Sequence, residues 1–379
     1  MSFTSLGLSP YLAKALTAQN YTKPYPIQEA AIPAILKGKD ILGIAQTGSG
    51  KTASYVLPTL MNLDRKTATK NRHINVLVLV PTRELAIQVE EVFRVFGSAL
   101  PFSFKSFAVY GGVSINPQMI GLQNVNVLVA TPGRLLELAE SNALHLSSVS
   151  TLILDEADKM LNLGFKAEMD RIFALLPKKR QNLLFSATLS PDVKNVERVL
   201  LNDPLVINIA PKEENLDLIN QLGYFVNEEK KGPLLRYLIK KSDMQQVLVF
   251  TSSTARADAV ADKLHHNGIP ARAIHSKKSQ GNRRASLEQF KAGKLRVLVA
   301  TDLLSRGIDI EFLPYVINYE LPRSPKDFVH RIGRTGRAEN PGQAITLITP
   351  DDKHHFKVIQ KKMKKAVTMI DSENLEDFK

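Results

Sequence analysis

Short, almost uninterrupted runs of Val, Ile and Leu alternate with longer amphipathic stretches, and this alternation limits the possible folds more than any other feature. In the first half such runs lie at 41–45, 76–80, 126–130, 151–154 and 182–186. Continuous apolar runs of this length are typical of strands buried on both faces. The stretches between them have helical spacing, as in 84–96, where Leu85, Val89, Val92, Phe93 and Phe96 share one face. Strand–helix alternation predicts a parallel, doubly wound α/β sheet.

The pattern stops near Ile209 and then resumes, which predicts a second domain of similar design. Residues 210–217 (APKEENLD) are polar and contain a proline, so we expect the linker there, between domains at 1–209 and 218–379. Strand-like runs follow at 247–251, 271–275, 296–301 and 315–319, and helical stretches at 254–267 and 283–292. A last helix is expected over 351–366. Its six lysines, from Lys353 to Lys365, suit a solvated helix face, with an RNA contact as the alternative.

Length and composition narrow the class of protein. With 379 residues the chain is too long for one ordinary core. It contains no cysteine, which excludes disulfides and thiolate metal sites and suits a cytoplasmic location. No apolar run is long enough to cross a bilayer, and the start of the chain lacks a basic region followed by a long apolar core. We therefore expect neither a membrane span nor a signal peptide.

The net charge of +13 is spread over both halves of the chain. Residues 1–207 hold 21 basic and 16 acidic side chains, and the remainder holds 29 and 21. Such a distribution suits a polyanion that lies across both domains. Solubility explains the same excess equally well, so the motifs have to decide.

A glycine-rich string, AQTGSGKT at 45–52, directly follows the strand-like run at 41–45 and precedes an apolar helical pattern. In a phosphate loop the glycines let backbone N–H groups approach the phosphates, the lysine reaches the β- and γ-phosphates, and the next hydroxyl binds Mg²⁺. A plain glycine-rich turn is the alternative. We predict an ATP site whose loop consists of Ala45, Gln46, Thr47, Gly48, Ser49, Gly50, Lys51 and Thr52, although Ala45 stands where the general pattern has its first glycine.

An acidic cluster, DEAD at 155–158, follows the strand-like run at 151–154. A carboxylate at the carboxyl end of a parallel strand lies at the rim where such sheets bind ligands. Asp155 is expected to hold Mg²⁺, and Glu156 to orient and deprotonate the attacking water. Alone, an acid-rich loop carries little weight, but beside a phosphate loop it predicts nucleotide hydrolysis.

The strings together resemble the DEAD-box RNA helicases, from about Phe3 to the last strand near Thr349. They are AQTGSGKT, PTRELA (81–86), GG (111–112), TPGR (131–134), DEAD, SAT (186–188), RGID (306–309) and HRIGRTGR (330–337). The segments GGVSINPQM, KRQNLLFSAT and KSQG, in and around these motifs, are most similar to the bacterial RhlE subgroup. The resemblance implies two tandem RecA-like domains.

The resemblance also implies an adenine pocket ahead of the phosphate loop. Residues 20–28, NYTKPYPIQ, match the family's Q motif, usually written GFxxPTPIQ. Gln28 would read the adenine edge and select ATP over GTP, with Tyr21 and Phe3 packed around the base. Asn20 replaces the usual glycine and Tyr25 the usual threonine, which puts the rim of the pocket in doubt.

In the second domain, HRIGRTGR places Arg334 and Arg337 three residues apart, which we expect to be neighbouring sides of a helical turn. By resemblance both are arginine fingers that reach the γ-phosphate when the domains close. Asp309 resembles the family's ribose-binding acid. The residues that would couple the nucleotide to the RNA are Asp158, Ser186, Thr188 and His330.

The remaining strings are implied to face RNA through its phosphates and sugars, without reading bases. The residues concerned are Arg83, Gly112, Thr131 and Arg134 in the first domain, and Thr251, Arg283 and Thr301 in the second. Near these residues the chain differs from the residues common in the family at two places, Ser276 with Lys277 and Leu304 with Ser305. The sequence does not explain either difference.

The expected function is ATP-dependent unwinding of short RNA duplexes, with ATP and Mg²⁺ as cofactors and RNA bound independently of its base sequence. An ATP-dependent RNA clamp with little unwinding is one alternative, and a DNA translocase is another. SAT and the Q motif argue against the translocase. The RhlE resemblance associates the chain with ribosome maturation or RNA turnover. A monomer is expected, and the sequence identifies no protein partner.

Overall fold

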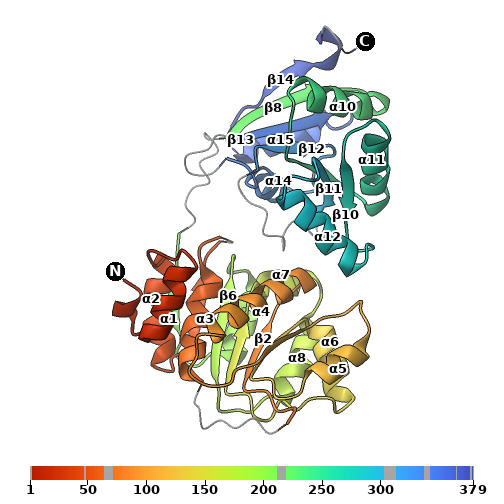
Figure 1. The fold of residues 1–379 in the computed structure, drawn as a ribbon. Coiled ribbons are helices and arrows are strands. Elements are labelled where there is room, and N and C mark those ends of the chain that lie inside the picture. Colours follow the sequence, from red (N-terminus) through yellow and green to blue (C-terminus); the bar gives the residue numbers. More distant parts are fainter. Residues whose placement is uncertain are drawn as a thin grey trace. The chain divides into compact units, whose positions relative to one another are not determined.

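The computed structural model describes residues 2–46, 48–63, 71–210, 219–302, 313–336, 342–363, 365–375 and 378. The chain divides into two compact units, Met1–Pro211 and Lys212–Lys379 (Figure 1). Most of the predicted linker, 211–217, lies outside the described residues, so its bounds remain a prediction. None of the described helices is both long and apolar enough to span a bilayer.

The described part of the first unit contains one parallel sheet with the strand order β3-β4-β2-β5-β6-β1-β7. Its strands are β1 (Ile41–Ile44), β2 (Val76–Leu79), β3 (Ser106–Val109), β4 (Val127–Ala130), β5 (Thr151–Leu154), β6 (Gln181–Ser186) and β7 (Leu205–Asn208). The helices are η1 (Thr4–Leu6), α1 (Pro10–Ala18), α2 (Pro26–Leu36), α3 (Lys51–Asn62), α4 (Arg83–Gly97), α5 (Ile115–Gly121), α6 (Pro132–Glu140), α7 (Ala157–Asn162), α8 (Lys166–Leu175) and α9 (Pro191–Leu200).

Helices cover both faces of this sheet, and alternate side chains of each strand enter different cores. On β2, Val76 and Val78 pack with the buried faces of α1 to α4. Leu77 and Leu79 pack with those of α6 to α9 on the other face. Because both faces are buried, a strand has no polar alternation, which is why continuous apolar runs marked the strands in the sequence.

The second unit contains a sheet of the same design, with the order β10-β11-β9-β12-β13-β8-β14 in its described part. Its strands are β8 (Ile219–Phe225), β9 (Val247–Thr251), β10 (Ala271–Ile274), β11 (Val297–Thr301), β12 (Tyr315–Asn318), β13 (Gly342–Ile348) and β14 (Thr368–Asp371). The helices are η3 (Glu228–Lys230), α10 (Lys231–Lys241), α11 (Thr254–His266), α12 (Gln280–Lys291), α14 (Pro325–Ile332), α15 (Lys353–Met363) and η4 (Ser372–Asn374). Helices α10 and α11 cover one face, and α12, α14 and α15 the other.

Counted from the first strand of each unit, the two strand orders are identical. The predicted α/β class with two parallel sheets is therefore confirmed. The strand-like runs agree with β1, β2, β4, β5, β6, β9, β10, β11 and β12 to within one residue at each end. The sequence patterns did not indicate β3, β7, β8 and β14, of which β3, β7 and β14 are only four residues long.

The start of β1 is held by one buried carboxylate, that of Asp40. Its Oδ1 accepts the N–H of Asn182 (2.8 Å), and its Oδ2 accepts the N–H of Asn202 (2.9 Å). We expect Asp40→Ala to lower the free energy of unfolding by about 2–4 kcal/mol, because it leaves the buried N–H of Asn182 without a partner and removes the bond from the exposed Asn202 to a charged acceptor, each worth about 1–3 kcal/mol. Urea unfolding followed by circular dichroism measures this. Asp192→Ala, at an exposed position on α9, is the control and should change stability by no more than about 1 kcal/mol; equal effects would contradict the assignment.

Candidate functional site

In the first unit, the residues singled out in the sequence follow the carboxyl ends of parallel strands. The glycine-rich loop follows β1, DEAD follows β5, and SAT begins at the end of β6. PTREL follows β2, GG follows β3, and TPGR follows β4. Because all carboxyl ends meet at one edge of the sheet, these loops share that edge. The strand order separates them: β5-β6-β1 carries the expected nucleotide loops, and β3-β4-β2 carries the expected RNA loops.

The loop after β1 has the backbone of a phosphate loop in its described part. The N–H of Ala45 donates to the carbonyl of Ser186 (3.0 Å), which continues the pairing of β1 with β6. Gly48 and Gly50 have φ values of 81° and 87°, in the left-handed region that favours glycine. Helix α3 then begins at Lys51, so its free N–H groups point into the loop. Thr47 lies outside the described residues.

Lys51 is buried at the base of this loop, where its Nζ donates to the carbonyl of Ala45 (2.6 Å). Burial lowers the pKa of Lys51, and the nearby carboxylates of Asp155 and Glu156 oppose that shift. The ammonium group thus faces the two acids of the DEAD string.

Asp155 and Glu156 are both buried and each keeps one carboxylate oxygen without a hydrogen-bond partner: Oδ1 of Asp155 and Oε2 of Glu156. The other oxygens are engaged. Tyr55 donates its hydroxyl to Oδ2 of Asp155 (2.8 Å), and Lys159 pairs with Oε1 of Glu156 (2.5 Å). Unsatisfied buried oxygens are costly and commonly mark a ligand site.

Glu156 also has an unusual backbone and environment. Its φ of 56° and ψ of 46° place it in the left-handed region, a strained conformation for a residue with a side chain. Burial raises the pKa of Glu156, and Asp155 adds to the rise, whereas Lys159 and Lys51 oppose it. A strained, buried acid with a raised pKa is typical of a functional position.

The donor set at this edge fits Mg²⁺. The unpartnered oxygen of Asp155 is a hard ligand, and Thr52, the second residue of α3, offers a hydroxyl. No group of three or more His, Cys, Asp or Glu side chains within the described residues is arranged to hold a metal ion. Mg²⁺ is usually bound by one or two carboxylates together with substrate phosphates and water, so this sparse set suits it.

The predicted coupling residues of the first unit lie together. Thr188 donates its hydroxyl to Oδ2 of Asp158 (2.9 Å), and Ser186 donates its hydroxyl to the carbonyl of Thr188 (2.7 Å). The SAT turn after β6 is thereby bound to α7, which begins beside Glu156. His330 belongs to the second unit, where it is exposed on α14.

The Q-motif residues pack around the phosphate loop. Gln28 is fully buried; its Nε2 donates to the carbonyl of Gly50 (3.0 Å), and its Oε1 accepts the N–H of Tyr25 (2.9 Å). One amide hydrogen and one lone pair of Gln28 remain for a ligand. Tyr21 lies edge-on to both Phe3 and Phe96.

The two departures from the Q motif have different structural outcomes. Asn20, in place of the usual glycine, has a φ of 60°, and asparagine is among the few residues other than glycine that adopt this conformation readily. Tyr25 is about half exposed, and its ring lies against Gly50, where an added Cβ would approach within 2.9 Å.

The expected RNA residues of the first unit lie in neighbouring loops. The guanidinium of Arg83 covers Gly112, where an added Cβ would lie 2.2 Å from Nη2. Arg134 donates from Nη2 to the carbonyl of Val113 (2.8 Å) and from Nε to Glu137 (2.8 Å), and its Nη1 has no partner. The buried Thr131 precedes α6 and starts the turn that carries Arg134.

In the second unit, the expected RNA residues follow the corresponding strands. Thr251 ends β9, Thr301 ends β11, and Arg283 lies on α12 after β10; all three are buried. Ser276 and Lys277 lie in the exposed turn between β10 and α12.

One prediction for this unit was wrong. Helix α14 ends at Ile332 with Gly333 as its C-cap residue, and Thr335 already pairs with Leu313 as in a parallel sheet, so Arg334 lies beyond the helix instead of on a helical turn. Its carbonyl accepts the N–H of Leu313 (3.1 Å). Arg337, Asp309, Leu304 and Ser305 lie outside the described residues.

Two models of known families match the chain: DEAD/DEAH box helicase over residues 25–196, and helicase conserved C-terminal domain over residues 229–339. ATP-dependent RNA helicase CshA of Limosilactobacillus reuteri is 39% identical over 95% of this chain and 72% of the relative. DEAD-box ATP-dependent RNA helicase RhpA of Helicobacter pylori is 38% identical over 98% of this chain and 74% of the relative. The chain belongs to the DEAD-box ATP-dependent RNA helicases.

Solved structures agree with this assignment. Saccharomyces cerevisiae Dbp5 bound to RNA and ADP BeF3 is 30% identical to this DEAD-box helicase, with a TM-score of 0.83 over 98% of this chain and 95% of that chain. A DEAD box protein from Methanococcus jannaschii is 36% identical, with a TM-score of 0.54 over 98% and 99%. The expected tandem RecA-like architecture is confirmed.

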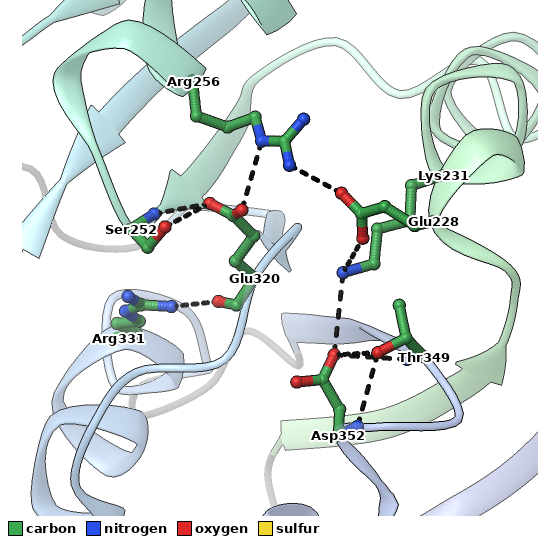
Figure 2. A network of polar contacts seen from close by, with 8 residues as sticks. All are labelled: Glu228, Lys231, Ser252, Arg256, Glu320, Arg331, Thr349 and Asp352. Atoms are coloured by element: carbon green, nitrogen blue, oxygen red, sulfur yellow. Dashed lines mark hydrogen bonds and ion pairs between the residues drawn. The ribbon is translucent and has the colours of Figure 1, made fainter.

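Several side chains that hold this helicase's site were missed in the sequence. Tyr55 follows Lys51 by one helical turn, and Lys159 follows Glu156 at i+3, so helical spacing was the available signal. In the second unit, the fully buried Arg331 binds both carboxylate oxygens of Asp302 (2.5 and 2.8 Å) and the carbonyl of Glu320 (2.6 Å; Figure 2). Arg331 belongs to the HRIGRTGR motif, among whose arginines the family resemblance implied roles for Arg334 and Arg337 only.

The hydroxyl of Tyr55 should be essential for orienting Asp155. Its pKa is raised well above the usual value by burial and by Asp155, so it remains a donor at every working pH. We expect Tyr55→Phe to leave Oδ2 of Asp155 buried without a partner and to lower the free energy of unfolding by about 1–3 kcal/mol. Chemical unfolding measures this. Tyr11→Phe is the control, because the exposed hydroxyl of Tyr11 donates to the sulfur of Met61 and to no carboxylate of the described residues; matching losses in the two variants would contradict the role of Tyr55.

Proposed function

We propose that the edge formed by β5, β6 and β1 hydrolyses ATP, and that the edge formed by β3, β4 and β2 holds one RNA strand by its backbone. The observation that carries this proposal is the pair of buried, unpartnered oxygens on Asp155 and Glu156, whose carboxylates lie close enough to Lys51, at the base of a glycine-rich loop, to oppose the lowering of its pKa. The names of the relatives and the RNA in the Dbp5 structure support ATP-driven unwinding of short RNA duplexes over the clamp alternative.

In this proposal the phosphate loop binds the nucleotide, and Lys51 moves from the carbonyl of Ala45 to the β- and γ-phosphates. Asp155 and Thr52 would hold Mg²⁺, which when bound neutralises charge on the transferring phosphate. Glu156 would accept the proton of the attacking water through Oε2, the oxygen that Lys159 leaves free. Gln28 would use its remaining amide hydrogen and lone pair for the adenine edge, beside Tyr21 and Phe3.

The roles of the second unit rest on the family resemblance. Arg334 and Arg337 would supply positive charge to the transferring phosphate, and Asp309 would bind the ribose. Thr251, Arg283 and Thr301 would contact the RNA backbone together with Arg83, Gly112, Thr131 and Arg134. The hydrogen-bonded group of Asp158, Ser186 and Thr188, with His330, would report nucleotide binding to the RNA side.

The subgroup, the cellular role, the location and the oligomeric state belong to the same proposal. The RhlE subgroup, and with it a role in ribosome maturation or RNA turnover, rests on three connecting strings, whereas the relatives reported above are named CshA and RhpA. A cytoplasmic location suits a chain that lacks cysteine, and action as a monomer is part of the same proposal.

Replacing Glu156 tests the hydrolytic half of the proposal. Glu156→Gln keeps the shape but cannot accept a proton, so RNA-stimulated kcat should fall roughly 10²- to 10⁴-fold while ATP binding persists. A steady-state ATPase assay with matched RNA and DNA oligonucleotides measures this, and only RNA should stimulate the wild type. Asp192→Asn, the same chemical change at an exposed position, is the control.

The pH dependence gives a second readout of the same base. Glu156 acts only when ionised, and burial raises its pKa. The acid limb of kcat should therefore lie at a higher pH than an ordinary glutamate would give, with activity lost as the pH falls through it. If Glu156→Gln hydrolyses ATP at a rate near that of the wild type, another residue must be the general base.

Replacing Arg134 tests the RNA half. Its Nη1 is the nitrogen left for a phosphate, so Arg134→Ala should weaken binding equally for unrelated RNA sequences. The slope of log K against log salt should become shallower by about 0.7, the value for one phosphate on a single strand. Titration of labelled RNAs at several salt concentrations measures both, with Arg94→Ala, an exposed ion-paired residue of α4, as control. Weaker binding with an unchanged slope would mean that Arg134 only positions the GG loop.

A further inference from the structure

Helix α15 of the second unit presents an exposed face of lysines that the proposed function does not use. Phe356 and Ile359 are buried against α14 and the sheet. The side chains on the opposite face, which are exposed, include Lys353, Lys357, Lys361 and Lys362. The helix is therefore fixed to the domain through its apolar side, and its basic side is turned to solvent.

The exposed side of α15 contains no acids, a feature that it shares with α10. Some exposed basic residues of other helices do pair within their own helix, as in Arg94–Glu91, Lys166–Asp170 and Arg284–Glu288. Residues 353–363 contain neither Asp nor Glu. Across the described part of the chain, no carboxylate forms an ion pair with Lys357 or Lys361.

The helix dipole does not explain these charges. Cations are stabilised near the carboxyl end of a helix and anions near its amino end. In α15 the first turn carries no acid and begins with Lys353, whose Nζ lies 4.9 Å from the centre of the Phe225 ring. Lys361 and Lys362, in the last turn, agree with the dipole, whereas Lys353 lies at the amino end beside Asp351 and Asp352, and Lys357 lies in the middle of the helix, where the dipole has little effect. The dipole therefore gives no reason for the first two lysines.

The spacing of the lysines suits a nucleic acid backbone. Lys353, Lys357 and Lys361 are four residues apart, so they rise about 6 Å per step along one side of the helix. Over that length a nucleic acid strand presents at least one phosphate. A straight row of this kind matches the regular phosphates of a duplex.

The position of α15 also points to RNA. A continuous set of polar contacts runs along the carboxyl edge of the second sheet (Figure 2). From Ser252, the neighbour of Thr251, it passes through Glu320, Arg256, Glu228 and Lys231 to Asp352, the residue before α15. All the basic groups in this set are paired. The lysines of α15, which form no ion pair with a carboxylate of the described residues, begin directly after it, on the same edge as the residue expected to touch RNA.

We propose that the lysine face of α15 binds the phosphates of duplex RNA that flanks the strand held by the core of the helicase. The proposal rests on the RNA-binding function proposed above and extends it to a second surface. Single-strand contacts are assigned to the β10-β11-β9 half of the sheet, and α15 covers the β13-β8 half, so RNA that reaches α15 lies beyond the gripped strand. Recognition there needs only charge and therefore reads no sequence.

The test compares two RNAs: a short single strand, and the same strand as the overhang of a hairpin. For the wild type, the hairpin should add affinity and steepen the salt slope. Lys357→Ala with Lys361→Ala should weaken binding of the hairpin RNA by roughly 10-fold and make its slope shallower by about 0.9 for each duplex phosphate lost. Fluorescence anisotropy over a range of salt concentrations measures both. Lys240→Ala with Lys263→Ala, on α10 and α11 of the opposite sheet face, makes the same charge change and should leave binding unaltered.

A measurement on the unmodified protein avoids any dependence on how the variants fold. The hairpin RNA should slow acetylation of Lys357 and Lys361, followed by mass spectrometry, and should leave Lys240 and Lys263 unaffected. Protection by anionic vesicles and not by RNA would overturn the proposal, as would equal losses on both RNAs in the double variant. If the wild type binds neither RNA, the proposed function fails as well; if it binds the single strand and the hairpin stem adds nothing, only the role of α15 fails.

Discussion

Parallel strand pairing is the constraint on which the rest of this molecule depends. Because neighbouring strands run in the same direction, every connection must cross a face of the sheet, and every loop that leaves a carboxyl end emerges at one edge. In the first unit this brings together side chains separated by more than a hundred positions, such as Lys51 and Asp155, without any long loop. The strand order then divides the edge, with hydrolytic groups on β5-β6-β1 and polar turn residues on β3-β4-β2.

The hydrolytic half of that edge contains several features that cost free energy of folding. Lys51, Asp155 and Glu156 are all buried, two carboxylate oxygens lack partners, and Glu156 has a left-handed backbone. Such features persist only when the surroundings hold them in place. Here the N–H of Asp155 is bound to the carbonyl of Leu79, and Tyr55 and Lys159 each hold one oxygen. The sheet supplies the rigidity that keeps these groups ready for a ligand.

Much of this could be predicted from the sequence because buried parallel strands are continuous apolar runs and the site strings directly follow them. The strands that were missed show the limit of that signal. Strand β7 (LVIN) and β14 (TMID) are edge strands with exposed residues, and β3 (SFAV) is mostly half-buried, so none has the uniform burial that marks a central strand.

The site shows a similar limit, because pairing partners are set by tertiary contacts. The sequence indicated Gln28 and Arg134 but could not show that Gln28 also bonds to Gly50 or that Arg134 holds the GG loop through Val113. Nothing in the local pattern distinguished the buried Arg331 from Arg334, and the end of α14 at Gly333 overrode the expected helical turn. By contrast, the left-handed φ of Asn20 explains a departure from the family that the sequence alone left open.

The identical strand order raises the question of how many nucleotides one chain binds. In each unit a buried lysine, Lys51 or Lys231, is the first residue of the first α-helix after the first strand. In the first unit that position faces a glycine-rich loop. In the second it is filled from within, because Lys231 pairs with the carboxylates of Glu228 and Asp352 (Figure 2). The second of these lysines thus has carboxylates of the protein itself as counter-anions, which predicts that a nucleotide binds to the first unit alone.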